Sequence, residues 1–247
     1  MAEQPETGFA HGLMPHLLEL RQRLIRSAAA VVVVFLCLMP FAAKLFDLLA
    51  APMMNALPAG SKMIATGVIT PFMVPVKVVL LLAFLLALPY VLHQAWGFIA
   101  PGLYAHEKRL VAPLIVASTL LFFAGVAFCY LFVFGVVFAF IQQFAPASIS
   151  VAPDIESYYG FVLTMFLAFG VTFEVPVVVV VLARAGLVTL AQLKRARPYV
   201  IVGAFVVAAI VTPPDVMSQL LLAVPLCLLY ELGLLVVPLF VHTAGQD

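Results

Sequence analysis

Two short charged motifs stand beside long apolar stretches, and the glutamate in each can bind a cation. They are Glu19-Leu20-Arg21 and Glu107-Lys108-Arg109, in a chain that is 66% hydrophobic and only 9% charged. Carboxylates form charge-assisted hydrogen bonds with cationic groups, so two carboxylates on one surface can hold a cationic ligand. The two motifs therefore predict a docking surface on one face of a membrane, for something cationic that arrives from that side.

Each motif also has a purely structural explanation. Glu19 stands four residues before Arg23, the spacing of an ion pair along one face of a helix. Leucines at helical spacing fill another face, so this stretch predicts an amphipathic surface helix that leads into the first span. Glu107 precedes an apolar stretch, where the partial positive charge of a helix N-terminus favours a carboxylate. The charge pattern alone leaves both anchoring and docking open.

One carboxyl group lies inside an apolar stretch. Glu174 interrupts the run 168–182, with no Lys or Arg in the same segment to neutralise it. An ionisable group at such a depth is costly and by default faces a bundle interior or a water-filled cavity. Gln219 is the best polar candidate to meet it, and a protonated carboxyl is the alternative. Asp215 follows two prolines and is expected to cap the last helix.

The composition argues against several other classes of function. A formal net charge of +1 provides no basic stripe for nucleic acid. The five histidines are scattered and the three cysteines lie far apart in apolar runs, so neither a metal site nor a disulfide is predicted. The sequence contains no hydrolytic or phosphate-cradling motif. We therefore expect a protein that is not an enzyme and needs no cofactor.

The apolar stretches predict an all-α membrane protein. In hydrocarbon every backbone N–H and C=O must be paired within its own segment, so long continuous apolar runs form helices. With the N-terminus inside, nine of the twelve Lys and Arg residues fall on the cytoplasmic side and three fall outside. This bias predicts six transmembrane helices with both termini in the cytoplasm. The expected spans are 27–43, 72–92, 110–141, 158–183, 199–211 and 216–237.

The expected spans differ in length. The third has 32 residues, roughly 48 Å as a helix, and must tilt, bend or project from the bilayer. The fifth has 13 residues, roughly 20 Å, which is less than a hydrocarbon core of about 30 Å. The fifth and sixth helices would form a hairpin that either thins the bilayer beside it or is shielded by its neighbours.

Six separated motifs resemble the TatC family, the multi-pass core subunit of the twin-arginine protein translocase. The resemblance runs from about residue 16 to residue 237. It implies a tilted, concave bundle over 16–240, with short fifth and sixth helices, between a polar N-terminal tail (1–15) and a C-terminal tail (241–247). The motifs are HLLELR at 16–21, QAWGFIAPGL at 94–103, HEKR at 106–109, FGVTFEVP at 169–176, KRARPY at 194–199 and TPPD at 212–215.

The resemblance implies a receptor for signal peptides with two consecutive arginines, in the bacterial cytoplasmic (inner) membrane. Such a receptor associates with itself and with single-span subunits of the TatA and TatB type, and moves folded proteins outward using the proton-motive force. By position, the residues implied to bind the peptide are Glu19, Arg21, Phe98, Leu103, Glu107 and Arg109. Those implied in transport or partner contact are Glu174, Asp215 and Gln219, with Pro52 and Phe72 at the extracytoplasmic loop.

One position departs from the pattern of the family, and two other classes of protein are alternatives. Gly67 stands where some relatives carry an acidic residue, which argues against a charge contact at this loop. A proton-coupled transporter would use Glu174 and Gln219, but it predicts paired repeats and broken helices, and the sequence indicates neither. In a structural scaffold, Glu19 and Glu107 would be dispensable.

Overall fold

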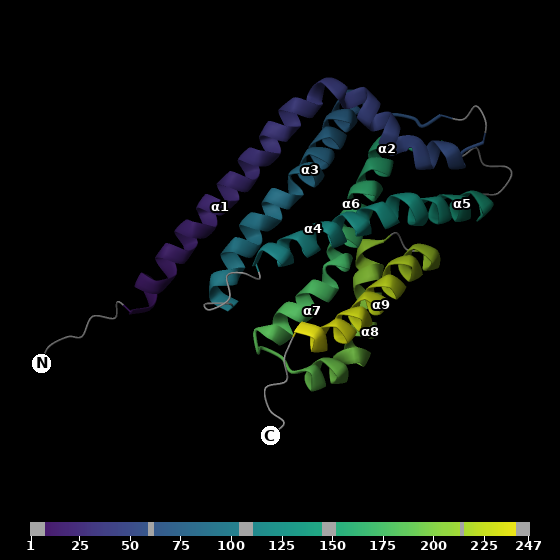
Figure 1. Ribbon diagram of the computed structural model, residues 1–247. Helices are drawn as coiled ribbons and strands as arrows, with labels where there is room; N and C mark the ends of the chain where they lie inside the picture. Colours follow the sequence, from purple (N-terminus) through teal and green to yellow (C-terminus); the bar gives the residue numbers. More distant parts are fainter. Residues whose placement is uncertain (1–7, 59–61, 104–110, 145–151, 213–214, 241–247) are drawn as a thin grey trace, which may run out of the picture.

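The computed structural model describes residues 8–58, 62–103, 111–144, 152–212 and 215–240. These residues are helical apart from loops and one isolated parallel bridge between Ile64 and Asp154. Figure 1 shows the helices side by side as a slanted array, with the N-terminal helix along one edge. The helices are α1 (Gly8–Leu38), α2 (Ala42–Ala56), α3 (Thr70–Leu103), α4 (Val111–Phe128), α5 (Phe134–Phe144), α6 (Ile155–Phe173), α7 (Val175–Arg184), α8 (Leu190–Val211) and α9 (Val216–Phe240).

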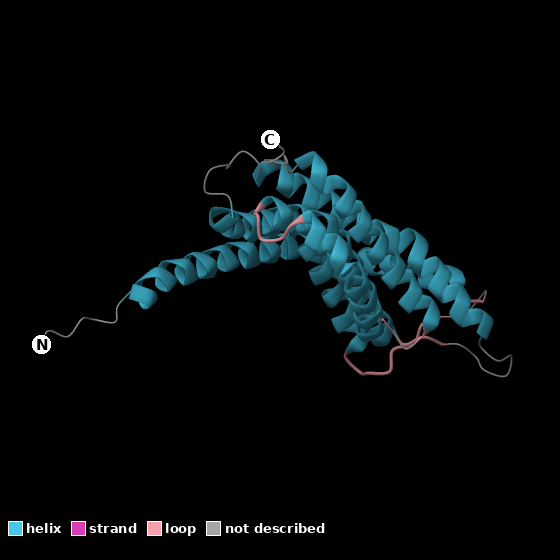
Figure 2. Cartoon of the chain, turned by 90° about the horizontal axis from the view of Figure 1, so that it is seen from below, coloured by secondary structure: helices cyan, strands magenta, loops and turns pink. Residues whose placement is uncertain are grey.

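The first membrane helix is longer than the sequence predicts, and it ends in a bend. α1 continues for 31 residues through the expected surface helix into the span, with no break between the two. A 3₁₀ turn, η1 (Met39–Phe41), separates α1 from α2. Pro40 in this turn removes a backbone donor, which permits the sharp change of direction seen in Figure 1. Figure 2 shows the helix that follows the N-terminus reaching away from the other helices.

The third expected span is a long helical run that contains a π-helical turn. α4, a π-helical turn (η3, Cys129–Val133) and α5 follow one another without a loop. Tyr130 lies in the π turn, and its hydroxyl donates a hydrogen bond to the Leu48 carbonyl of α2 at 2.7 Å. π turns widen a helix locally and interrupt its regular hydrogen bonding. The combined run crosses α6 obliquely (Figure 1).

The fourth expected span is broken near its middle. α6 ends at Phe173, Glu174 forms the junction, and α7 starts at Val175. Pro176 accounts for the break, because it has no N–H to donate to the Thr172 carbonyl and its ring would clash with that carbonyl. The span expected over 158–183 is matched by Ile155–Arg184, which is long and apolar enough to cross a membrane, and its helix is interrupted at Glu174.

The last three helices pack together as one unit. α8 and α9 form an antiparallel hairpin, in which Arg197 Nη2 lies 2.6 Å from Glu231 Oε2. The Tyr230 hydroxyl donates a hydrogen bond to the Leu193 carbonyl at 2.8 Å. Apolar side chains of α7, α8 and α9 share a buried cluster: Val179, Ala183, Leu193, Tyr230, Leu234 and Val237.

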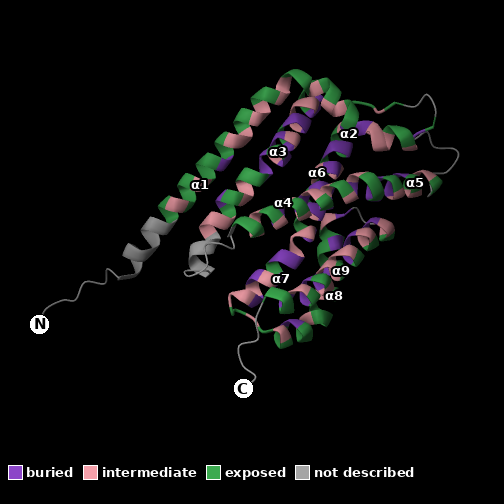
Figure 3. Cartoon of the chain, in the orientation of Figure 1, coloured by how far each residue is buried: buried purple, intermediate pink, exposed green. Residues whose placement is uncertain are grey.

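A larger buried cluster holds the other helices together. It lies mainly between α3, α4, α5 and α6, where Phe134, Val162 and Phe169 are fully buried. Phe134 and Phe166 stack with ring centroids 5.4 Å apart. Figure 3 shows the buried residues concentrated on α3 and α6, whereas most of α1 is exposed or half-buried. In a membrane, these exposed apolar surfaces face lipid rather than water.

Five helical stretches of the described chain are long and apolar enough to cross a membrane. The expected fifth span, 199–211, is not among them, because it is only the apolar second half of α8. The first half of α8 carries Lys194, Arg195 and Arg197. The described part of the chain is thus all-helical, with the several apolar stretches of a multi-pass membrane protein. The five stretches are Leu17–Ala56, Thr70–Phe98, Ala112–Gln143, Ile155–Arg184 and Val216–Phe240.

Candidate functional site

Glu19 lies on α1 in an ion pair with Arg23. Arg23 Nη2 and Nε donate to Glu19 Oε1 at 2.7 and 2.9 Å, and 41% of the Glu19 side chain is exposed. The i,i+4 pair expected from the sequence is therefore confirmed. Among the described residues, no group bonds to Glu19 Oε2. One carboxylate oxygen is thus oriented by Arg23, while the other is accessible to a ligand.

Arg23 is itself fixed against α3, which the sequence analysis did not anticipate. Its Nη1 donates to the backbone carbonyl and to the side-chain oxygen of Gln94, each at 3.4 Å. Gly97 makes room for this approach, since a Cβ atom there would lie 2.5 Å from Arg23 Nη1. The glycine beside Trp96 was the available signal in the sequence. Arg23 therefore ties Glu19 to the turn 94–97 of α3.

The other residues of the expected docking surface are described only in part. Arg21 is exposed on α1, and Phe98 is half-buried on α3. Leu103 is the last residue of α3, and its side chain lies outside the described part of the structure. Glu107 and Arg109 also lie outside the described residues. The structure therefore places Glu19 and Phe98 at the same α1–α3 end, and the pairing of Glu19 with Glu107 stays a prediction.

Glu174 lies at the junction of α6 and α7. Its Oε1 is buried without a hydrogen-bond partner within the described residues. On α4, the buried Ser118 accepts a hydrogen bond from Trp96 Nε1 at 3.0 Å. Gln219 instead donates to the Phe205 carbonyl at 3.3 Å. The expected contact between Glu174 and Gln219 is therefore wrong.

Asp215 has the capping role that the sequence predicts. Its Oδ1 accepts a hydrogen bond from the backbone N–H of Ser218 at 2.6 Å, directly before the first turn of α9. This contact satisfies one of the free N–H groups at the start of the helix. Gln219 lies in the same turn, half-buried.

The loop between α2 and α3 is attached to the start of α6. The Ile64 N–H donates to the Pro153 carbonyl and the Ile155 N–H donates to the Ile64 carbonyl, both at 2.9 Å. Asp154 Oδ1 accepts from the Thr66 hydroxyl at 2.9 Å, and its Oδ2 accepts from the Ser157 N–H at 3.0 Å. The Ser157 N–H, together with the weaker Thr66 bonds, holds the pKa of Asp154 below its ordinary value.

Charge contacts do occur near this loop, although Gly67 offers none. Lys77 Nζ lies 2.7 Å from Glu156 Oε1, which joins α3 to the first turn of α6. Pro52 is half-buried within α2, and Phe72 is 64% exposed in the first turn of α3. The structure thus anchors the loop through Asp154 and Glu156.

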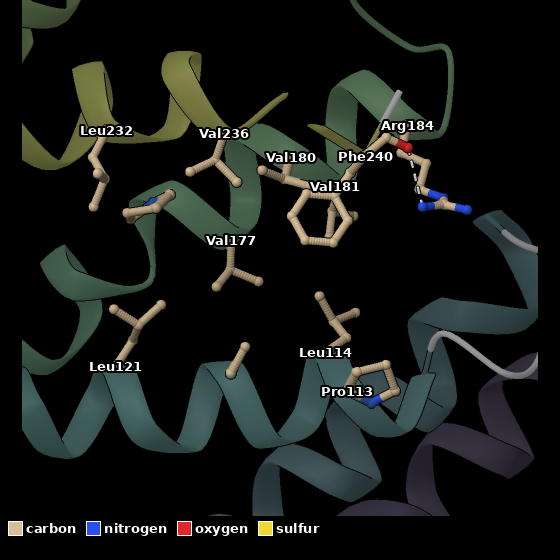
Figure 4. Close-up of a pocket in the computed structure, with 12 residues that line it drawn as sticks. Pro113, Leu114, Leu121, Val177, Val180, Val181, Arg184, Leu232, Val236 and Phe240 are labelled. Carbon is tan, nitrogen blue, oxygen red and sulfur yellow. Dashed lines mark hydrogen bonds between the residues drawn. The ribbon is translucent and has the colours of Figure 1, made fainter. Parts of the chain in front are cut away.

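An apolar groove separates α4 from α7 and α9. Its volume is about 280 Å³. Arg184 lies at one end, where its Nη1 donates to the Phe240 carbonyl at 3.1 Å (Figure 4). Because its walls are almost entirely apolar, the groove suits a hydrocarbon chain better than the polar solute of a transporter. Side chains that line it include Pro113, Leu114, Leu121, Val177, Val181, Leu232 and Val236.

Comparisons with known proteins match most of the chain. The family described as Sec-independent protein translocase protein (TatC) matches residues 15–225. The TatC protein of Azotobacter chroococcum mcd 1 is 52% identical over 233 residues, which are 94% of this chain and 91% of that protein. The TatC protein of Escherichia coli (strain K12) is 50% identical over 221 residues, which are 90% and 86% of the two chains.

A solved structure agrees with these matches. It is described as the crystal structure of twin arginine translocase receptor TatC, and it is 39% identical with a TM-score of 0.78. The similarity covers 91% of this chain and 98% of that chain. The sequence match over 15–225 includes Glu19, Glu174 and Asp215. The chain therefore belongs to the TatC family of Sec-independent protein translocase proteins.

Proposed function

We propose that the chain is the signal-peptide receptor and core subunit of a translocase that exports folded proteins bearing twin-arginine signal peptides, driven by the proton-motive force. The observation that carries this proposal is the state of Glu19. It is a half-exposed carboxylate with one oxygen held by Arg23 and the other accessible. A guanidinium can bind the accessible oxygen without displacing Arg23. The similar solved structure is itself named a twin-arginine translocase receptor.

A second carboxylate, Glu107, is proposed to receive the second arginine. It follows the end of α3 by four residues, and the turn 94–97 of α3 already contacts Arg23. Two carboxylates discriminate an arginine pair from a lysine pair, because a guanidinium presents several N–H donors in a fixed plane, whereas a lysine ammonium binds as a point charge. Arg21, Phe98, Leu103 and Arg109 are proposed to complete the surface around the two carboxylates.

We infer six membrane crossings, with α8 as the fifth. The Arg197–Glu231 pair and the short connection after Val211 set α8 antiparallel to α9. The apolar part of α8 after Arg197 therefore runs beside the first part of α9, which is long enough to cross. An even number of crossings puts both termini on one side, and the distribution of Lys and Arg favours the cytoplasm. The bacterial relatives of the chain favour the bacterial cytoplasmic (inner) membrane as its location.

The remaining candidate residues are proposed to act after docking. Glu174, Gln219 and Asp215 are assigned to transport, and Pro52 and Phe72 to partner contact at the extracytoplasmic loop. Partners would be single-span subunits of the TatA and TatB type, and further copies of this chain. The chain would recognise and pass its cargo without changing a covalent bond, so it is not assigned an enzymatic activity.

Binding of paired synthetic signal peptides tests the proposal. One peptide carries Arg-Arg, and the other carries Lys-Lys in an otherwise identical sequence. The purified full chain should retain the Arg-Arg peptide in a pull-down and release most of the Lys-Lys peptide. The variant Asp47→Asn is a matched control and should bind both peptides as the unmodified chain does, since Asp47 is an exposed carboxylate on α2 and not a residue of the proposed docking surface. Equal retention of both peptides by the unmodified chain would contradict a twin-arginine receptor.

A further inference from the structure

The apolar groove between α4, α7 and α9 extends over the depth of one membrane leaflet. It runs along α4 from Pro113 to Leu121 and along α7 from Pro176 to Arg184, and side chains of the two helices face each other across it (Figure 4). The ends of each stretch are eight residues apart, which is a rise of roughly 12 Å. Half of a hydrocarbon core of about 30 Å is roughly 15 Å. The length of the groove therefore suits one acyl chain of one leaflet.

One end of the groove lies at a membrane surface and carries a cation. Arg184 is the last residue of α7, and its guanidinium donates to the carbonyl of Phe240, the last residue of α9, at 3.1 Å. Pro113, on the opposite wall, lies in the first turn of α4. Two helices end here and a third begins, so this end is at the surface and the other end lies within the bilayer. By the inferred topology, the surface is the cytoplasmic one.

The sequence around this end is basic. Residues 176–199 contain four Lys or Arg residues and no Asp or Glu. Arg184 lies at the groove, Arg197 is paired with Glu231, and Lys194 and Arg195 are exposed on the first half of α8. Basic residues beside an apolar groove on the cytoplasmic side favour an anionic lipid headgroup.

The groove is accessible to lipid and too small for a helix. Leu232 and Phe240 line it and are 46% and 50% exposed, so it opens at the surface of the helices, where lipid chains lie in a membrane. Its volume is about 280 Å³, whereas a helical segment about 10 Å wide and 12 Å long occupies roughly 900 Å³. A single hydrocarbon chain therefore suits the space better than the helix of a partner subunit.

We propose that the groove is a binding site for an anionic phospholipid of the cytoplasmic leaflet. One acyl chain lies between α4 and α7, and the phosphate accepts hydrogen bonds from the Arg184 guanidinium. The lipid fills the space between α4, whose Phe122 belongs to the larger buried cluster, and α7, whose Val179 belongs to the smaller one. Its binding requires no signal peptide, so the site is independent of the docking surface around Glu19.

Lipid binding to the purified full chain tests the site. The delipidated chain in detergent is mixed with phosphatidylglycerol or with phosphatidylcholine of the same acyl chains, and native mass spectrometry measures the fraction that retains one lipid. We expect phosphatidylglycerol to bind about tenfold more tightly, because it lacks the cationic group that opposes Arg184 in phosphatidylcholine. Equal affinity for the two lipids would overturn an anionic site. Retention of neither would overturn a lipid site and indicate a helix of another chain as the occupant.

Four variants locate the binding. Arg184→Gln should weaken phosphatidylglycerol binding about tenfold, the size of one hydrogen bond to a charged group. Ala117→Phe should prevent binding, because Ala117 lines the groove on α4. The matched controls are Arg195→Gln on α8 and Ala112→Phe at an exposed position of α4 outside the groove, and both should bind within about twofold of the unmodified chain. Equal losses in Arg184→Gln and Arg195→Gln would reduce the site to general attraction by a basic surface and overturn the proposal.

Thermal unfolding gives a second readout, which decides the matter even where Ala117→Phe folds poorly. A lipid that binds only the folded chain raises its unfolding temperature. Phosphatidylglycerol should raise the unfolding temperature of the unmodified chain and of Arg195→Gln, and should raise that of Arg184→Gln much less. The same rise in all three would overturn the role of Arg184. Failure of the unmodified chain to bind the Arg-Arg peptide would instead refute the proposed function and leave the lipid result valid.

Discussion

The two best-described candidate carboxyls, Glu19 and Glu174, occupy opposite kinds of environment. The Glu19 side chain is 41% exposed, and one of its carboxylate oxygens forms an ion pair with Arg23. Glu174 lies at a helix break, with its Oε1 buried and without a hydrogen-bond partner among the described residues. The structure thus pairs Glu19 with a cation, whereas it gives Glu174 no ion pair within its described part.

This difference indicates different roles for the same residue type. An exposed carboxylate in a charged neighbourhood can capture a cationic ligand from water, with an attraction that salt screens. A carboxyl among apolar helices interacts strongly with any polar group that enters, because the local dielectric is low. Docking at Glu19 and transport at Glu174 should therefore be separable by mutation.

The docking side of the comparison should show the largest effect. Glu19→Gln and Glu107→Gln should each weaken Arg-Arg peptide binding about tenfold, and together about 100-fold, since each removes one charge-assisted contact. The difference in peptide affinity between the unmodified chain and the variants should shrink between 0.1 and 1 M salt, where the Debye length falls from about 10 Å to about 3 Å. Titration of a labelled peptide measures both effects. Binding unchanged in the double variant would remove Glu19 and Glu107 from the site.

Salt also tests the role of Glu174 in transport, but here we expect the effect of the mutation to be independent of salt. Glu174→Gln should slow export roughly tenfold, and that factor should be the same at low and high salt because the group is shielded from mobile ions. Export rates measured when the docking surface is saturated with signal peptide isolate the transport step from docking. A defect that high salt abolishes would place Glu174 in a solvated site like that of Glu19.

Asp215 is a third carboxylate to compare with Glu19 and Glu174, and its role in the described structure is to cap α9. Asp215→Ala should destabilise the start of α9 by about 1 kcal/mol, whereas Asp215→Asn keeps the cap and should cost only a fraction of that. Thermal unfolding of the purified chain measures the difference. Normal stability with lost export in Asp215→Asn would show that the charge is needed as well as the cap.

The smallest expected effect concerns Asp154, outside the membrane spans. Its pKa is lowered in the folded state, so its stabilising contribution is complete above the ordinary value of about 3.9 and is lost as the pH falls through the lowered value. Hydrogen exchange at the Ile64 N–H should therefore stay slow from neutral pH down to about 4, after correction for intrinsic exchange rates. Loss of protection near pH 6 would show that a titratable group other than Asp154 holds the loop in place.

Much of the fold follows from the sequence because apolar length is a strong signal. Four of the five helical stretches that can cross a membrane match their expected spans closely, including the overlong third span. The break at Glu174 was missed although Pro176 was in view, because prolines are tolerated in many membrane helices. The bend at Pro40 and the uninterrupted α1 were missed for a similar reason: a hydropathy pattern gives the extent of a span but not its path.

The candidate site was predictable only where its contacts are local. The Glu19–Arg23 pair and the Asp215 cap join residues four or fewer apart, and both are confirmed. The contacts of Arg23 with Gln94 and of Ser118 with Trp96 join different helices, and one sequence does not reveal helix register. Gln219 was paired with Glu174 because both are polar in apolar runs, but it lies on the α8–α9 hairpin and bonds to α8.

Crosslinking between positions 19 and 107 tests the central claim most directly. The experiment uses Glu19→Cys with Glu107→Cys, in a chain whose three native cysteines, Cys37, Cys129 and Cys227, are replaced by alanine. We expect a short bismaleimide added from the cytoplasmic side of inverted membrane vesicles to join the two positions within one chain. Failure to crosslink, when each single cysteine variant reacts with a maleimide, would contradict a shared docking surface for two arginines.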